Sequence, residues 1–469
     1  MFDTVIAPSG TLLGLLQRGR GDGTLHALTA PREEALAALN HCVLSDPRHD
    51  WQVENRSLYY ARLYLDLNGS LEQIALHLFC AEDVLDSDET RTGLALSVLG
   101  HLASYGRDDA LMLLRRYAAE GSNWAWALDE LALRDDDSGL RALAEPVLAR
   151  FPRTAEGDTE LSAAVRDAFE PRPWRLWAED PRESIGARVR AAGERGSFDQ
   201  WQRQMRPAGP RPGWSVAAVF AWAEEAMGRG AGRHVPAARC LTAVAGPEDL
   251  PEIISAARSG SDGARSTALR YLADAQDPVV LDLVEAALID GSGTVIEAAV
   301  DAFERMTDDN ALERARRWAE RPDALGAAAG RVLACRGGAQ DAALVLGALR
   351  EAVRSEGADA LTLWTLVDGT GRLGIACAAP VLRHIYRETA SSHLRGRAAN
   401  ALAATDPSFA AGFAVECLWD CEETTRELAA RRAETADSRV VEQLRRLAAD
   451  PAEETEMETV VRSRIGPDA

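Results

Sequence analysis

Apolar residues in the second half of the chain recur at helical spacing, in alanine-rich stretches that short polar turns divide. Such stretches occupy residues 264–274, 295–306, 325–335, 393–405 and 425–436. Aspartates recur about every 32 residues with one double interval, a period typical of stacked helical repeats: Asp277, Asp309, Asp341, Asp406 and Asp437. Because a carboxylate there can accept the first amides of the following helix, we expect these aspartates to be N-caps.

The first half carries a weaker form of the same pattern. Apolar residues at helical spacing predict helices over 57–67, 71–85, 90–104, 108–120, 123–133 and 138–150. Residues 1–31 are typical of a cap, in which Gly19, Gly21 and Gly23 follow a short helix. Glycines that follow a helix, not a strand, favour a helix C-cap over a phosphate-binding loop.

Residues 151–235 interrupt this rhythm, because proline accumulates there together with five of the eleven tryptophans. The pattern therefore predicts an all-α fold, an α-α superhelix of the HEAT-like solenoid type with an irregular Pro/Trp-rich joint. We expect three segments: an N-terminal cap and repeats over 1–150, the joint over 151–235, and a repeat array over 236–469. The acidic residues after Asp450 are expected to form a frayed tail.

The repeated segments resemble the HEAT repeat, in the shorter bacterial form first noted in phycobilin lyases. One copy has Asp277-Pro278, an alanine-rich helix over 295–306 and then Asp309; a second begins at Asp406-Pro407. The family's Val-Arg pair, at the start of each second helix, corresponds to Ala264-Arg265, Leu394-Arg395 and Thr425-Arg426. The resemblance covers about 236–452 and, less clearly, 57–150. It implies a right-handed superhelix whose second helices line the concave side. It implies no single activity, because the family includes scaffolds, lyase subunits and DNA glycosylases.

Composition narrows the possible chemistry. Hydrophobic residues make up 46% of the chain and aromatic residues only 6%, which favours helices over a β-sandwich or barrel. The net charge is −21, which argues against sequence-independent binding to phosphate backbones and equally suits solubility or a basic partner. Every one of the 52 basic residues is arginine, so the chain cannot use a lysine in catalysis.

Cysteines give little sign of a metal or redox site. The seven cysteines are scattered without a CxxC pair, and most lie in apolar stretches. Cys417 and Cys421 are one helical turn apart and could share a metal, but a core position is the simpler interpretation. We assign no metal, cofactor or catalytic residue. Without a leader or a membrane-spanning apolar run, we expect a cytoplasmic protein.

The densest polar cluster runs from Asp46 to Arg56 and continues into a tyrosine-rich helix. His49 with Asp50 could act as an acid–base pair, and Trp51 and Tyr60 could stack on a ligand. The alternative is a capped helix entry whose charges pair locally while the tyrosines pack beneath the first repeat.

A second candidate cluster lies at 124–130, where Trp124 and Trp126 precede Asp129 and Glu130. Because two residues two positions apart on a helix point in different directions, at most one indole is expected in the core. The other could anchor a partner or bind an arginine or lysine against its ring. We therefore predict a binding surface between about residues 46 and 135, formed by His49, Asp50, Trp51, Tyr60, Trp124, Trp126, Asp129 and Glu130.

These observations favour a non-catalytic scaffold that binds a protein or peptide, possibly one bearing arginine or lysine, on a concave solenoid face. The alternative is an enzyme or enzyme accessory, lyase-like or glycosylase-like, acting on a ligand in the N-terminal concavity. Trp126 with Asp129 is the nearest match to a glycosylase pair. Nucleic-acid binding is not expected; it would require arginines to align on the second helices, where the candidates are Arg265, Arg270, Arg331, Arg395 and Arg397.

Overall fold

The computed structural model describes residues 6–48, 55–85, 89–204, 213–230 and 232–466. This part of the chain is 74% helical and contains no β-strand, which confirms the predicted all-α class. None of its helices is both long and apolar enough to span a membrane. The chain forms two compact units, which divide it differently from the three predicted segments. Unit 1 holds residues 1–206, 387–399 and 408–469, and unit 2 holds 207–386 and 400–407.

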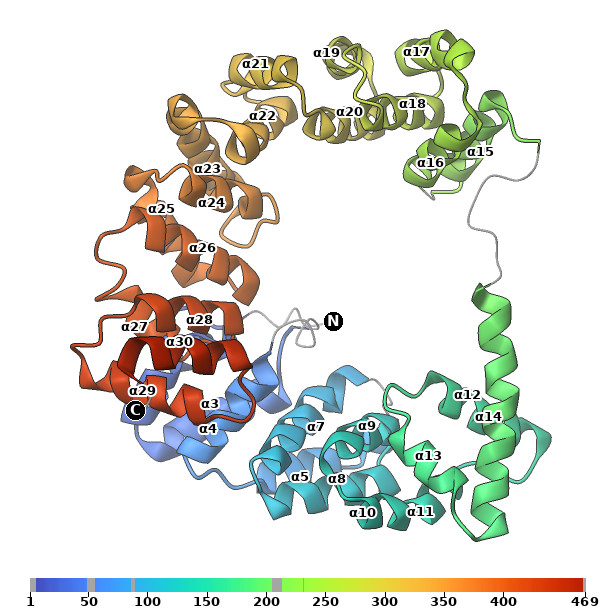
Figure 1. Ribbon diagram of the computed structural model, residues 1–469, viewed down its shortest axis with the longest axis vertical. Helices are drawn as coiled ribbons and strands as arrows, with labels where there is room; N and C mark the ends of the chain where they lie inside the picture. Colours follow the sequence, from blue (N-terminus) through green and yellow to red (C-terminus); the bar gives the residue numbers. More distant parts are fainter. Residues whose placement is uncertain (1–5, 49–54, 86–88, 205–212, 231, 467–469) are drawn as a thin grey trace. The chain divides into compact units, whose positions relative to one another are not determined.

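Unit 2 is built from helical hairpins (Figure 1). Helices α18, α20, α22 and α24 contact one another in series, and each also packs against the helix that precedes it in the sequence. Its helices are α15 (Val216–Gly228), α16 (His234–Val244), α17 (Leu250–Ser259), α18 (Asp262–Asp274), α19 (Val280–Asp290), α20 (Gly293–Arg305), α21 (Asp309–Trp318), α22 (Ala324–Arg336), α23 (Ala342–Glu356) and α24 (Leu363–Arg372). Helices α25 (Ala379–Glu388) and α26 (Ser392–Thr405) contain the boundaries between the units.

Small residues allow the second helices of unit 2 to approach closely. A Cβ atom on Gly369 in α24 would lie 2.5 Å from the carbonyl oxygen of Ala334 in α22, so this crossing requires glycine. The interior follows the predicted pattern. Side chains of the alanine-rich helices α18, α20 and α22 are buried, among them Ala268, Leu272, Ala299, Phe303, Ala329 and Leu333.

Unit 1 combines the N-terminal helices with those of the C-terminal segment. The N-terminal helices are α1 (Leu12–Gln17), α2 (Gly21–Thr29), α3 (Arg32–Leu44), α4 (Arg56–Asp66), α5 (Glu72–Leu78), α6 (Glu82–Leu85), α7 (Glu89–Ser104), α8 (Asp108–Glu120), α9 (Trp124–Arg134), α10 (Asp137–Ala142), α11 (Ala144–Leu148), α12 (Ala155–Asp167), α13 (Arg172–Ala178) and α14 (Glu183–Gln204). The C-terminal segment adds α27 (Phe413–Cys417), α28 (Glu423–Arg432), α29 (Ser438–Ala449) and α30 (Thr455–Ile465).

Two predicted irregular regions are helical. The Pro/Trp-rich segment holds α12 to α15, and Pro173 sits in the first turn of α13, where a missing amide costs little. Trp174 and Trp177 are buried in the core of unit 1, so large aromatics add packing, not disorder. The acidic tail also forms a helix, α30, and Glu453 before it is buried. In their described residues, both segments are therefore largely helical.

The recurring aspartates have more varied roles than predicted. Asp437 caps α29, as expected, but α21 is capped by Asp308, one residue before the predicted Asp309. Asp406 instead accepts a hydrogen bond from Arg383, and Asp341 accepts both the amide of Gly338 and Nε of Arg316, each at 2.9 Å. An aspartate near a helix start can satisfy an amide or a guanidinium, and the sequence pattern alone does not separate the two.

The second-helix arginines form the most regular contact between repeats. Arg265, Arg395 and Arg426 are all buried. Each pairs with a carboxylate later in the sequence: Arg265 with Asp290 at 2.9 Å, Arg395 with Asp420 at 2.7 Å and Arg426 with Glu453 at 2.8 Å. These pairs join helices within unit 2 in the first case and within unit 1 in the other two.

The packing of unit 2 leads to a prediction about the stability of the protein. Replacing Leu272 by alanine should lower the free energy of unfolding by about 2–5 kcal/mol, because a large buried side chain leaves a cavity between stacked repeats. Urea unfolding followed by tryptophan fluorescence measures the change. Leu361→Ala is the matched control, since that leucine is exposed and should change stability by less than about 0.5 kcal/mol. Equal effects of the two substitutions would contradict the stacking described for α18.

Candidate functional site

The N-terminal polar cluster is structural in the part that can be described. Asp46 forms ion pairs with Arg56, whose side chain is fully buried, and with Arg48, at 3.6 Å between Oδ1 and Nε. These ion pairs match the alternative interpretation given above, a capped helix entry whose charges pair locally. His49, Asp50 and Trp51 lie outside the described residues, so their predicted roles stay predictions.

Tyr60 was predicted to contact a partner, but the structure places it in the core. Its ring is buried, and its hydroxyl donates a hydrogen bond to the carbonyl oxygen of Leu16 at 3.0 Å. Neighbouring Tyr59 is buried in the same way and donates to the carbonyl oxygen of Arg20 at 2.8 Å. Burial raises the pKa of both phenols well above their ordinary value. Helix α4 is covered on nearly all sides, which is why a tyrosine-rich helix here packs inward.

The two predicted tryptophans on α9 are both half-buried against the core of unit 1. The ring of Trp124 meets those of Phe151 and Trp174 edge to face, with centroids 5.7 and 6.3 Å away. Trp126 donates from Nε1 to the hydroxyl of Ser97 at 3.2 Å. Neither indole is fully buried and neither is fully exposed, because α9 packs on α7, α8 and α13.

The carboxylates of α9 differ in their surroundings. Glu130 forms an ion pair with Arg134 at 2.6 Å and accepts a hydrogen bond from Ser97 at 2.7 Å. Asp129 instead accepts the backbone amide of Glu170 at 3.0 Å. Burial, together with the negative charges of Glu170 and Glu130, raises the pKa of Asp129 to about 6, although hydrogen bonds from backbone amides act in the opposite direction. Asp129 is thus a half-buried carboxylate close to two other acidic residues, Glu130 and Glu170.

Exposed apolar side chains flank Asp129. Leu133 lies one turn further along α9 and is 60% exposed. Phe169, which precedes Glu170 in the loop between α12 and α13, is 82% exposed. We call this region the α9 surface: Trp126, Asp129, Leu133, Phe169 and Glu170. Sequence reasoning found its first two residues but assigned Phe169 and Glu170 to the joint, although an aromatic-acid pair just before Pro171 was a visible signal.

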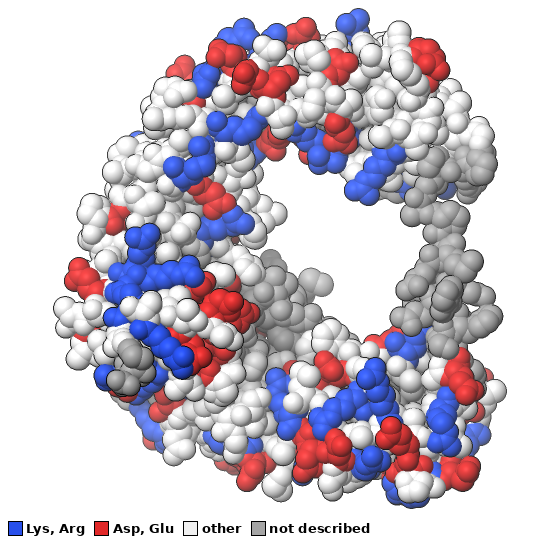
Figure 2. Space-filling view, in the orientation of Figure 1, with Lys and Arg blue, Asp and Glu red and all other residues white. Residues whose placement is uncertain are grey.

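Arginines on the second helices are engaged with acids. Arg270 pairs with Asp274 at 3.1 Å and with Asp301 at 3.0 Å, and Arg331 pairs with Glu304. Together with the buried Arg265 and Arg395, these residues are four of the five, Arg397 being the fifth, that a nucleic-acid interface was expected to require. Figure 2 shows arginine and acidic side chains interspersed on the face it presents. Their charges are therefore largely compensated by internal partners.

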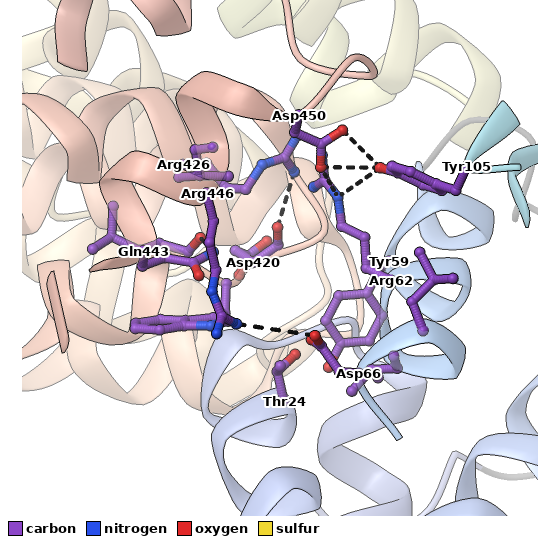
Figure 3. Close-up of a pocket in the computed structure, with 15 residues that line it drawn as sticks. Thr24, Tyr59, Arg62, Asp66, Tyr105, Asp420, Arg426, Gln443, Arg446 and Asp450 are labelled. Carbon is purple, nitrogen blue, oxygen red and sulfur yellow. Dashed lines mark hydrogen bonds and ion pairs between the residues drawn. The ribbon is translucent and has the colours of Figure 1, made fainter. Parts of the chain in front are cut away.

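A cavity of about 170 Å³ lies within unit 1, between the N-terminal helices and the C-terminal segment (Figure 3). Arg62 of α4 reaches Asp450 and Glu453, each at 2.8 Å, and the hydroxyl of Tyr105 donates to Asp450 at 2.7 Å. Arg446 lies 4.0 Å from Asp66. The charged groups that line this cavity thus hold one another. Among the described residues, no group of three or more His, Cys, Asp or Glu side chains could bind a metal.

Comparisons with known proteins add little. No protein-family model matches the chain, and no curated protein sequence does either. One matching solved chain comes from a study of a conserved phosphorylation switch that controls the interaction between cadherin and β-catenin. It is 14% identical, with 98% of this chain and 92% of that chain covered, at a TM-score of 0.27. A TM-score this low supports no inference about function, and the resemblance to HEAT repeats stays a prediction.

The surroundings of Asp129 predict a pH dependence of stability. A carboxyl whose pKa is higher in the folded than in the unfolded state destabilises the fold once it ionises, so its cost appears as pH rises from about 4 to 6. Asp129→Asn should therefore be more stable than the wild type at pH 7.5, and the difference should shrink by pH 4.5. Urea midpoints at both pH values measure this. Glu160→Gln, an exposed acid on α12, should show no such trend; a pH-independent difference for Asp129→Asn would contradict the assignment.

Proposed function

We propose that this protein is a non-catalytic, protein-binding helical-repeat scaffold whose α9 surface takes up a partner segment bearing arginine or lysine. One observation carries the proposal: Asp129 and Glu170 lie together, joined through a backbone hydrogen bond, beside a phenylalanine that is 82% exposed. An exposed aromatic ring next to compatible polar groups is typical of residues that anchor a protein interface. A guanidinium or ammonium group would relieve the mutual repulsion of the acids and could stack on the ring.

The internal pairing of the other candidate clusters supports this choice over an enzyme. Asp46, Arg48 and Arg56 hold one another at the entry to α4. Arg62, Asp450 and Glu453 do the same around the cavity. Groups that are engaged in ion pairs are poorly placed to transfer protons or to bind a substrate, so we propose no reaction.

The charge of the whole chain suits such a partner. With a net charge of −21, long-range attraction speeds the encounter with a basic segment and weakens as salt is added. Because Asp129 has a pKa of about 6, a bound cation should also displace its proton. Binding through the α9 surface should therefore strengthen as pH rises from 5 to 7.

Peptide binding tests the proposal. The probes are synthetic peptides in which one arginine or lysine is flanked by leucine and phenylalanine, with charge-reversed glutamate versions for comparison. We expect the full chain to bind members of the basic panel in fluorescence anisotropy. Asp129→Asn and Phe169→Ala should each weaken that binding by roughly 1–3 kcal/mol.

Leu361→Ala removes an exposed apolar side chain of unit 2 and serves as the matched control, with no expected effect. If no basic peptide binds, the proposal fails. If both α9-surface variants are stable and bind as the wild type does, the site lies elsewhere, and the Trp-rich segment 174–222 becomes the next candidate.

A further inference from the structure

The two ends of the chain meet inside unit 1 at a contact that we call the terminal junction. It joins residues 7–66, which contain α1 to α4, to residues 387–399 and 408–469. Figure 1 shows α4 beside α29, and Arg446 of α29 lies 4.0 Å from Asp66 of α4. Hydrogen bonds connect residues that are more than 300 positions apart in the sequence, such as Arg18 and Glu388.

Arginines of the N-terminal segment make many of these bonds. Arg18 donates from Nε to the carbonyl oxygen of Glu388 at 3.2 Å, and Arg20 donates to that of Arg387 at 2.9 Å. Arg48 donates to the carbonyl oxygen of Ala390 at 2.7 Å. Two guanidiniums from residues 7–24, together with that of Arg48, therefore converge on backbone acceptors that lie within four residues of each other. The fork of the arginine side chain suits this use, because it presents several donors in a fixed geometry.

Acidic residues of the C-terminal segment receive further donors. Asp450 and Glu453 bind Arg62 of α4, and Glu453 also binds Arg426. Arg395, held by Asp420, reaches back to the carbonyl oxygen of Gly19 at 3.4 Å. The amide of Cys421 donates to the same oxygen at 2.9 Å. The C-terminal segment thus offers carboxylate acceptors to Arg62 and donors to the carbonyl oxygen of Gly19.

Close contact at the junction depends on glycine. A Cβ atom on Gly21 would lie 1.8 Å from the carbonyl oxygen of Glu416, and one on Gly19 would lie 2.4 Å from the sulfur of Cys421. Gly19 also has a φ of 66°, as the C-cap of α1 requires. Two of the three alternating glycines therefore serve the approach of the two ends, in addition to the predicted C-cap.

Apolar packing across the junction is sparse. The core cluster that contains Leu12 runs through the N-terminal helices to Ala192, and among the described residues the C-terminal segment contributes only Cys421 to it. The junction borders the 170 Å³ cavity, and two buried carboxylate oxygens of the junction, Asp22 Oδ1 and Glu453 Oε2, have no hydrogen-bond donor in the described part. A polar, imperfectly packed contact resembles a reversible interface more than a domain core.

We propose that the C-terminal segment is an arginine-accepting docking site that the chain's own residues 7–24 fill as a built-in ligand. This proposal is independent of the α9 surface. The linked segment acts at a high effective concentration, so it keeps the site closed to free peptides of the same kind. Substitutions that remove the guanidiniums of Arg18 and Arg20 should open the site to an added peptide that carries arginine.

The test uses the full chain and a fluorescent peptide with the sequence of residues 7–24. Arg18→Gln with Arg20→Gln removes two donors from the built-in segment, and this double variant should bind the peptide at least about tenfold more tightly than the wild type. Arg32→Gln is the matched control, because Arg32 donates to Leu67 and Asn68 within the N-terminal helices and should leave peptide binding unchanged. A peptide in which glutamine replaces both arginines should bind at least about tenfold more weakly.

Three results would overturn the proposal: a folded double variant that binds the peptide no better than the wild type, an equal gain in Arg32→Gln, or binding that ignores the arginines of the peptide. If circular dichroism shows that the double variant is unfolded, Arg20→Gln alone takes its place. It should gain at least about threefold in peptide affinity, and a folded single variant without any gain contradicts the proposal equally.

Discussion

Ion pairs between a buried arginine and a carboxylate on a later element are the interaction on which this structure most depends. Arg265, Arg395 and Arg426 each occupy the start of a second helix, and each is paired with an acid at less than 3 Å. A buried guanidinium that loses its partner is left uncompensated, at a cost of about 3–5 kcal/mol. The chain contains no lysine, so all of these positions use the same rigid fork. The register of neighbouring repeats is tied to these contacts as much as to apolar packing.

Because these arginines form ion pairs inside the units, they also limit which ligands the surface can bind. Arginines that bind Asp290, Asp301, Asp341 and Glu304 inside the units cannot contact an external phosphate without breaking those pairs. The chain has 73 acidic residues and 52 arginines, so not every carboxylate can have an arginine of its own. At the α9 surface, Asp129 and Glu170 lie beside exposed apolar side chains. The proposed binding surface and the fold therefore depend on the same feature, which is the placement of the arginine side chains.

Much of the fold followed from the sequence because helical periodicity and the 32-residue interval are local signals. The alanine-rich helices α18, α20, α22 and α26 were predicted for this reason, and the second-helix arginines were located through the HEAT-like pattern. Long-range contacts were not predictable in the same way. Nothing near Tyr60 indicates that α4 is covered on several sides, and nothing near Glu453 indicates Arg62, almost 400 residues earlier. Asp129 was found from its neighbours in sequence, whereas Phe169 joins it only through the fold.

The central claim is that polar contacts of arginine, with little apolar packing, hold the C-terminal segment to the N-terminal helices of unit 1. Native-state hydrogen exchange read by mass spectrometry tests it most directly, by comparing peptides that cover 416–421 with peptides from the core of α7. The 416–421 amides should exchange with a lower opening free energy than the amides of α7. A concentration of 1 M NaCl should speed their exchange and leave that of α7 unchanged. Equal protection of both regions, insensitive to salt, would contradict it.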